Sequence, residues 1–179
     1  MNADSLTADL KNEAHRLGFD LAGPEAGNAA SEHREAFDIA RRAGLGITVH
    51  AGEAAGPESI RQAIDVCGAR RLGHATRLFE DPALMGRVRD EDIAVEICLT
   101  SNVQTHAVAG FADHPVRRYF DEGLNVSLHT DNRLMSGTTV TEEYVRAAEH
   151  LGFSLEELLV MVRNGYRSAF DPDISGTRA

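Results

Sequence analysis

Side chains suited to metal and proton chemistry stand where several short apolar runs of the chain end. His50 closes one run and Glu53 follows three residues later, His74 closes the next, and Asp131 follows a later one. Imidazole and carboxylate groups together are preferred ligands of catalytic Zn²⁺, which keeps one position open for water. A glutamate close to a ligand can carry a proton without binding the metal. The pattern is therefore typical of metal-assisted hydrolysis.

Each of these residues also has a structural interpretation. A lone histidine at a strand end is more often a hydrogen-bonded structural residue, Glu53 could cap the following helix, and Asp131 could be a helix cap or turn residue. His129 shares the face of Asp131 because side chains alternate along a strand, and we interpret it as structural rather than as an extra ligand. The joint placement of the others at successive run ends favours the functional interpretation.

The elements that must position these side chains alternate along the chain. Apolar, β-branched runs predict strands at 19–22, 46–50, 71–74, 94–99 and 125–129. Amphipathic segments predict helices at 31–42, 57–67, 81–89, 115–122, 141–151 and 154–168. Ser31 is the expected N-cap of the first helix, Gly68 and Gly152 are expected to end two others, and Ser154 with Glu157 has capping-box spacing.

Strands that alternate with helices through short connections predict an α/β fold with a parallel sheet. An open doubly wound sheet and part of a (β/α)₈ barrel both fit this order. No strand is followed by a glycine-rich phosphate-binding motif, and the polar residues lie at the C-terminal ends of the strands, which favours the TIM-type barrel. We predict one domain over 1–179, with an N-terminal helix or extension at 1–17 and a frayed C-terminus at 171–179.

Composition limits the possible partners and compartment. The formal net charge is −10, so binding to a nucleic-acid backbone is not expected. No stretch approaches 18 apolar residues, and the polar, acidic N-terminus does not resemble a signal peptide. Cys67 and Cys98 form no CxxC pattern, which is typical of a reduced protein. We expect a cytoplasmic protein with no membrane or nucleic-acid partner.

Five segments, in order, resemble the signature segments of the adenosine deaminase family. They are GFDLAGPEAG (18–27), ITVHAGE (47–53), RLGHA (71–75), EICLTSNVQT (96–105) and SLHTDNRLMS (127–136). The similarity runs from about residue 18 to Phe170. It implies an amidohydrolase barrel with Zn²⁺, which deaminates adenosine or a related purine nucleoside by hydrolysis to inosine and ammonia.

The resemblance implies a role for each residue at the strand ends. His50 matches a zinc ligand of the family and Asp131 matches a second ligand. Glu53 matches the residue that donates a proton to ring nitrogen N1 of the purine, which makes C6 electrophilic. His74 matches the histidine that orients and polarises the water at the metal.

Two further positions match residues at the substrate. Gly23 matches a glycine whose backbone lies against the purine. Asn132 stands where the family often has a second aspartate that bonds the purine. Ala75 stands where glycine is usual after the histidine, so a methyl group is added near the pocket.

The sequence departs from the family pattern at its metal site. The family supplies two more ligands through an H-x-H at the end of its first strand, and no H-x-H occurs in these 179 residues. A complete barrel takes ~250 residues, so about five of eight βα units are expected here. With His50 and Asp131 alone, zinc should bind weakly or not at all. We therefore do not expect efficient deamination by this chain unless a missing N-terminal half or another chain completes the barrel. A homodimer could restore strands, but a second copy cannot supply an H-x-H that it does not encode.

Other functions remain open. The chain could be a non-catalytic fragment or truncated paralogue that binds a purine or a partner chain, or a deaminase of adenine or another purine. The open edges of a partial barrel are expected to expose unpaired backbone groups and an apolar interior.

Overall fold

The computed structural model describes residues 18–175, apart from positions 24 and 26. Within them, parallel strands form one sheet in chain order: β1 Phe19–Leu21, β2 Ile47–Ala51, β3 Arg71–His74, β4 Ala94–Ile97 and β5 Val126–Leu128. Each strand pairs with the strand before it, so the C-terminal ends all lie along one edge. The predicted α/β fold with a parallel sheet is confirmed.

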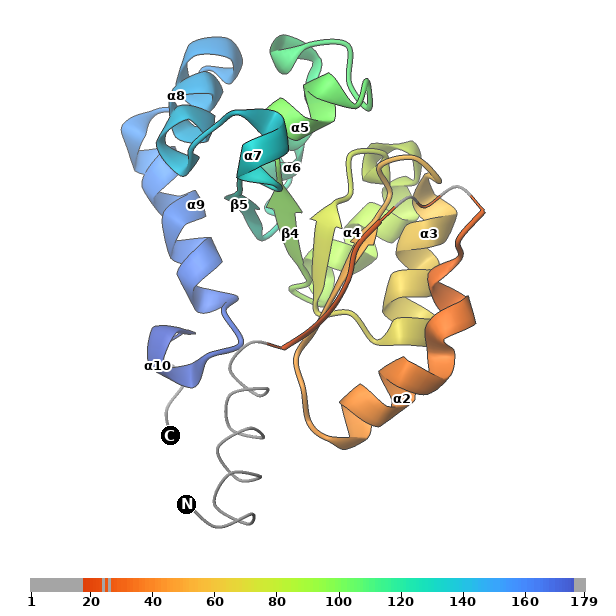
Figure 1. Ribbon diagram of the computed structural model, residues 1–179. Coiled ribbons are helices and arrows are strands. Elements are labelled where there is room, and N and C mark those ends of the chain that lie inside the picture. Colours follow the sequence, from red (N-terminus) through yellow and green to blue (C-terminus); the bar gives the residue numbers. More distant parts are fainter. Residues whose placement is uncertain (1–17, 24, 26, 176–179) are drawn as a thin grey trace.

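Helices lie outside the curved sheet, with α2 and α3 beside β1 and β2 and with α8 and α9 beside β5 (Figure 1). The helical segments are η1 Ala30–His33, α2 Arg34–Arg42, α3 Pro57–Gln62, η2 Ala63–Cys67, η3 Leu78–Glu80, α4 Pro82–Asp90, α5 Leu99–Gln104, η4 Phe111–Asp113, α6 Val116–Asp121, α7 Arg133–Ser136, α8 Val140–Leu151, α9 Leu155–Arg167 and α10 Pro172–Ser175.

Several helix ends follow the sequence signals. Gly68 and Gly152 both adopt left-handed backbone and end η2 and α8. Ser154 and Glu157 form the expected capping box at the start of α9. Ser31 is not a cap, because the first helical segment already begins as a tight turn at Ala30.

The predictions for the two ends of the chain have different outcomes. The helix expected at 1–17 lies outside the described residues. Fraying was expected over 171–179, whereas α10 covers 172–175 and positions 176–179 are not described.

The two faces of the sheet have opposite character. Val49, Leu72, Val95 and Val126 are fully buried beneath the helices and form the centre of the core. Successive side chains of a strand point to opposite faces, so the residues between them line the inner face.

The inner face is polar. Asp20, Thr48, Arg71, Glu96 and His129 line its cavity. The Arg71 guanidinium lies 3.3 Å from the Glu96 carboxylate, and Thr48 donates a hydrogen bond of 3.1 Å to the same carboxylate. The face is therefore more polar than the apolar interior that was expected, because Arg71 and Glu96 pair on it.

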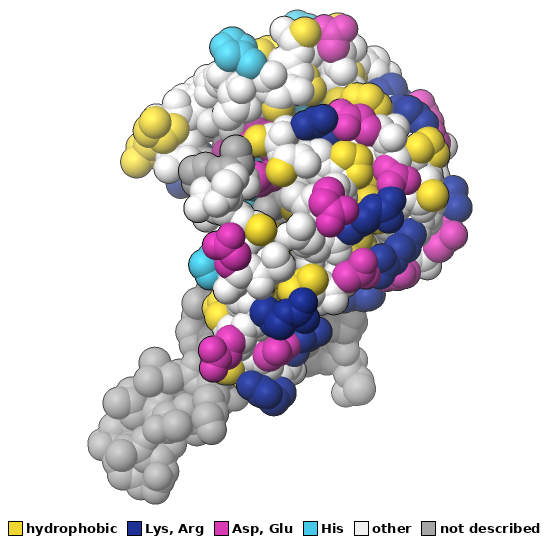
Figure 2. All heavy atoms as spheres, turned by 90° about the vertical axis from the view of Figure 1, so that its right-hand side faces the viewer, with side chains coloured by type: hydrophobic (Ala, Val, Ile, Leu, Met, Phe, Trp, Pro, Cys, Tyr) yellow, Lys and Arg dark blue, Asp and Glu magenta, His cyan; other side chains and the backbone are white. Residues whose placement is uncertain are grey.

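The outer surface over α2, α3 and α4 carries both signs of charge side by side (Figure 2). Arg87, for example, pairs with Asp65 at 2.8 Å and with Glu91 at 2.7 Å. Such exposed pairs contribute little stability each and leave no single-sign field over this face. Among the described residues, no helix is long and apolar enough to cross a membrane.

A buried carboxylate holds the short helix α5 in place. Glu143 of α8 is fully buried and accepts hydrogen bonds from the backbone N–H and hydroxyl of Thr100, in the first turn of α5. It also accepts a 2.9 Å bond from the Thr138 hydroxyl and lies 3.4 Å from the Arg146 guanidinium. These contacts satisfy N–H and O–H groups that no water reaches, and they fix the helix that carries residues 101–104 to the strand ends.

Glu143→Ala should lower the free energy of unfolding by about 2–3 kcal/mol, because it leaves the buried Thr100 N–H and hydroxyl without an acceptor. Urea unfolding followed by circular dichroism measures the loss. Glu149→Ala, on the exposed face of the same helix, is the matched control and should change stability by less than about 0.5 kcal/mol. Equal losses in both variants would contradict the capping role of Glu143.

Candidate active site at the strand ends

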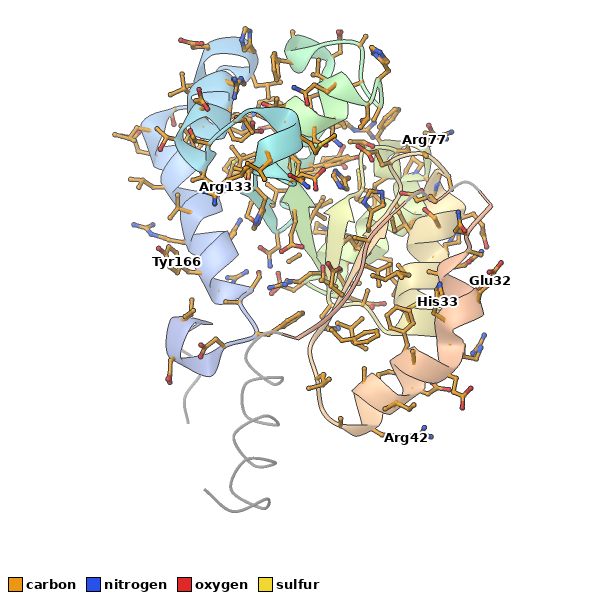
Figure 3. All side chains as sticks on the ribbon, viewed as in Figure 1. Glu32, His33, Arg42, Arg77, Arg133 and Tyr166 are labelled. Atoms are coloured by element: carbon orange, nitrogen blue, oxygen red, sulfur yellow. The ribbon has the colours of Figure 1, made fainter. Side chains whose placement is uncertain are left out.

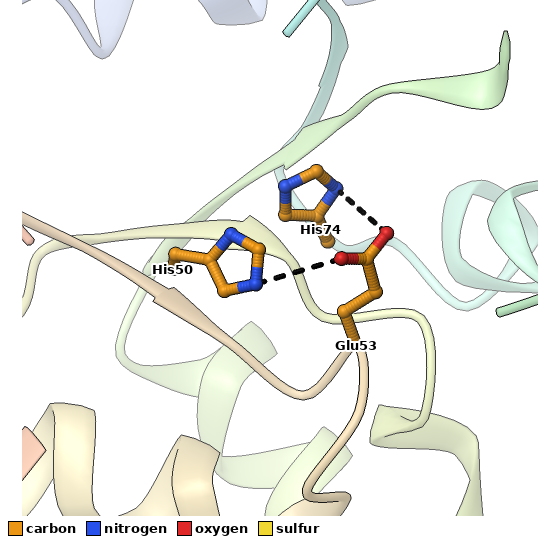
Figure 4. A group of neighbouring side chains, drawn as sticks. All are labelled: His50, Glu53 and His74. Atoms are coloured by element: carbon orange, nitrogen blue, oxygen red, sulfur yellow. Dashed lines mark ion pairs between the residues drawn. The ribbon is translucent and has the colours of Figure 1, made fainter. Parts of the chain in front are cut away.

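Three of the residues singled out by the sequence meet at the C-terminal edge of the sheet: His50, Glu53 and His74 (Figure 4). His50 Nε2 lies 3.5 Å from Glu53 Oε2, and His74 Nδ1 lies 3.6 Å from Glu53 Oε1. The two imidazole rings are 4.4 Å apart between centroids. The carboxyl group therefore lies between two imidazoles, one from β2 and one from β3.

Left-handed backbone conformations at the strand ends set the directions of the side chains of the site. Gly52 follows β2 with a φ of 76°, and an added Cβ there would lie 2.4 Å from Ile60, so only glycine fits. His74, Ala75 and Asp131 also have positive φ, between 46° and 64°. For residues with a Cβ this conformation costs roughly 1–2 kcal/mol each. Such strain concentrates at functional sites.

Asp131 borders the same cavity but not the same cluster. It lines a hollow of about 360 Å³ together with His50 and His74. Its Oδ2 accepts a 2.7 Å hydrogen bond from the Ser101 hydroxyl. Among the described residues, the possible metal-ligand atoms that all lie within 4.8 Å of one another belong to His50, Glu53 and His74.

Gly23 lies on the other side of His50. It follows β1 with a φ of 137°, and an added Cβ would meet no atom within 4 Å. It lines a second hollow, of about 560 Å³, that also reaches His50. The backbone at Gly23 is therefore open to a ligand.

Asn132 has a structural task in addition to its expected one. Its Oδ1 accepts hydrogen bonds from the backbone N–H groups of Leu134 and Met135, so it is the N-cap of α7. The amide oxygen is thereby engaged, and the NH₂ group is the part that remains for a ligand.

Glu25 had no expected role, and its carboxylate organises the loop after β2. The side chain is 5% exposed and accepts hydrogen bonds from the backbone N–H groups of Glu53, at 2.8 Å, and Ala55, at 2.6 Å. The Ser59 hydroxyl donates a third, at 3.1 Å. Burial alone would raise the pKa of Glu25, but His50 and the two backbone donors outweigh it and lower the pKa to about 2.

Asn102 of α5 is a second contributor without an expected role. Its Nδ2 donates a 2.6 Å hydrogen bond to Glu53 Oε1 and lies 2.9 Å from His74 Nδ1. The Thr105 hydroxyl donates to the same Glu53 oxygen at 2.9 Å. The polar run 100–102 after the fourth predicted strand was a signal for such contacts, but spacing alone gives no partner.

The surroundings shift the pKa values of the two imidazoles in opposite directions. Burial alone would lower the pKa of His50, but the carboxylates of Glu25 and Glu53 outweigh it and raise that pKa. In His74 burial prevails and lowers the pKa below 6.5. Two neighbouring groups whose pKa values are shifted apart in this way can take different roles in acid–base chemistry. The lowered pKa leaves His74 neutral near pH 7.

The chemistry of the donor set fits a divalent ion such as zinc. His50 offers an imidazole nitrogen and Asp131 a carboxylate on one cavity, and both groups are ordinary zinc ligands. Among the described residues, the group whose possible ligand atoms lie close enough to share an ion is His50, Glu53 and His74, and Asn102 already contacts Glu53 Oε1 and His74 Nδ1.

Comparison with known proteins places this arrangement in context. A family model described as adenosine deaminase matches residues 4–177. An adenosine deaminase of Klebsiella pneumoniae subsp. pneumoniae is 48% identical over 160 residues, which are 88% of this chain and 48% of that protein. The chain spans about half the length of the curated relatives it matches.

Solved structures agree in fold. An adenine deaminase of Arthrobacter aurescens superposes with a TM-score of 0.84 at 29% identity, over 98% of this chain and 57% of that one. A cog1816 amidohydrolase of B. ambifaria with bound Zn gives a TM-score of 0.80 over 88% of this chain and 45% of that one. At 22% identity, the second likeness shows the fold alone.

Glu25→Gln should loosen the loop that carries Glu53, because one amide NH₂ would then face a backbone N–H donor instead of accepting from it. We expect amide hydrogen exchange at Glu53 and Ala55 to accelerate at least about tenfold, with a loss of about 1.5–3 kcal/mol in unfolding free energy.

The matched control is Glu32→Gln, since Glu32 is exposed and points away from the sheet (Figure 3). Unchanged exchange at Glu53 and Ala55 in the Glu25 variant would show that other contacts hold the loop.

Proposed function

The chain belongs to the adenosine deaminase family, and on this premise we propose that its strand ends form the proton-donating and substrate-facing part of a hydrolytic purine deaminase site. The substrate we propose is adenosine, which water converts to inosine and ammonia. The observation that carries the proposal is the Glu53 carboxyl group, held between His50 and His74, the two histidines that line the cavity.

Glu53 is suited to act as the acid. Asn102 and Thr105 both donate to Oε1, so that oxygen accepts and a proton on the carboxyl group belongs on Oε2. Transfer of that proton to N1 of the purine withdraws electrons from the ring and makes C6 electrophilic. Water then adds its oxygen at C6, one of its protons replaces the proton that Glu53 gave to N1, and the other goes to the amino group. The bond between C6 and the amino nitrogen breaks, which releases ammonia and leaves inosine with N1–H and a C6 carbonyl.

The metal ligands that we propose from this chain are His50 and Asp131. When bound, zinc supplies a Lewis acid that makes water nucleophilic near neutral pH. His74, neutral and fixed by Asn102, is placed to orient that water by a hydrogen bond. The carboxylates of Glu25 and Glu53 raise the pKa of His50, so a metal competes with a proton for this imidazole.

Substrate recognition is proposed at Gly23 and Asn132. The backbone of Gly23 offers polar groups to the purine with no side chain in the way. Because the Asn132 oxygen caps α7, its NH₂ group donates, which suits an unprotonated ring nitrogen of a purine.

We propose that the remaining metal ligands come from polypeptide beyond these 179 residues, since the sequence contains no H-x-H. A barrel partner, either a further segment or a separate chain, is the proposed source. The alternative of purine or partner binding without catalysis is supported by the same shortage of ligands. A cytoplasmic location is also proposed, and it is supported by Cys67 and Cys98, which are buried free thiols.

The purified 179-residue chain with added zinc should convert adenosine to inosine far more slowly than the ~10 s⁻¹ of a median enzyme, because two ligands define a metal position poorly. Conversion is followed by chromatography of the nucleosides, and bound zinc by elemental analysis. Turnover near ~10 s⁻¹ would show that these residues alone complete the site.

Glu53→Gln should lower the zinc-dependent conversion by about 100-fold or more, because an amide cannot donate the acidic proton. Bound zinc should stay unchanged, since Glu53 is not a proposed ligand. Glu122→Gln, on the exposed end of α6, is the control and should retain the parent rate. Inosine formation that is insensitive to the Glu53 substitution would refute the proposed function.

A further inference from the structure

A line of buried polar groups runs from the start of α6 to the candidate site. The backbone N–H of Val116 donates to His114 Nδ1 at 3.1 Å, and His114 Nε2 lies 3.1 Å from Asn102 Oδ1. Asn102 Nδ2 then contacts Glu53 Oε1 at 2.6 Å and His74 Nδ1 at 2.9 Å. Asn102 is fully buried, and His114 and His74 are at most 5% exposed. Bulk water therefore has little access to these groups.

Donor and acceptor rules fix the state of His114. A backbone N–H can only donate, so Nδ1 of His114 accepts and carries no proton. Burial, with a smaller effect from His74, lowers the pKa of His114 to about 3, so its ring is neutral at pH 7. A neutral imidazole without a proton on Nδ1 carries it on Nε2, and this N–H donates to the Asn102 oxygen.

The orientation of Asn102 follows from that donor. Its oxygen must face His114, so its NH₂ group faces the site and has two protons to give. One goes to Glu53 Oε1 and the other to His74 Nδ1. His74 therefore accepts at Nδ1 and carries its own proton on Nε2.

We propose that His114 is a positioning residue for this site: its Nε2–H locks the Asn102 amide, and the amide in turn sets which atoms of Glu53 and His74 carry protons. The proposal rests on the proposed function for its catalytic meaning, but the protonation pattern itself does not. A flipped amide would put its oxygen 2.6 Å from a carboxylate oxygen and would offer the His114 N–H a donor instead of an acceptor.

Nuclear magnetic resonance of the full chain, without metal or substrate, tests the pattern. Long-range ¹H–¹⁵N correlation of ¹⁵N-histidine distinguishes the two neutral imidazole tautomers and the charged form. At pH 7 we expect both His114 and His74 as Nε2–H tautomers. An Nδ1–H tautomer or a charged ring at either position would overturn the proposal.

Two substitutions separate positioning from packing. His114→Leu keeps an apolar volume but has no donor, whereas His114→Gln places a side-chain NH₂ near the position of Nε2. In His114→Leu we expect His74 to become a mixture of tautomers and the Asn102 side-chain NH₂ to exchange at least about tenfold faster. His114→Gln should restore both signals towards the parent values.

Each outcome bears on the proposal. If His114→Leu folds with the parent His74 tautomer and the parent Asn102 exchange rate, His114 does not set the pattern. If His114→Leu does not fold, the spectrum of the parent chain and the His114→Gln variant still test the proposal. A changed His74 tautomer in a folded His114→Gln variant overturns it. A chain with the expected tautomers whose inosine formation does not respond to Glu53→Gln would refute the proposed function and leave the positioning role intact.

Discussion

The buried amide of Asn102 is the contact on which the candidate site depends. It is reached by no water, so each of its hydrogen-bonding groups must find a protein partner. Those partners come from three places that are far apart in the chain: the loop after β2, the end of β3 and the segment before α6. Helix α5 can present the amide there because Glu143, on α8, caps its first turn. The site is thus held by a polar framework as well as by the sheet.

Much of the fold could be predicted from local signals. The runs around Val49, Val95 and Val126 place the strands within one or two residues, because β-branched residues and helix-ending glycines act locally. Helix α5 escaped prediction because Leu99 extends the apolar run of β4 and Cys98 provides no side-chain cap. What stabilises α5 is Glu143, 43 positions further along the chain from Thr100, and that contact has no local signature.

The candidate site, like the fold, could be predicted only in part. His50, Glu53 and His74 could be proposed to meet because parallel strands end at one edge, and the structure does bring them together. Asp131 reaches the same cavity, but sequence spacing could not show that Ser101 holds its carboxylate outside the three-residue cluster. Contacts such as the one between Glu25 and the backbone of Glu53 depend on how loops pack, and residue order does not encode them visibly.

The polar inner face of the sheet has a consequence for how such a protein is assembled. A concave surface of leucine and valine would adhere to other chains until it was covered, whereas on this face Thr48, Arg71 and Glu96 contact one another. The uncovered face therefore presents paired polar groups instead of an adhesive apolar surface. That lining makes the barrel a natural starting point for split-protein complementation, in which separately made pieces are joined.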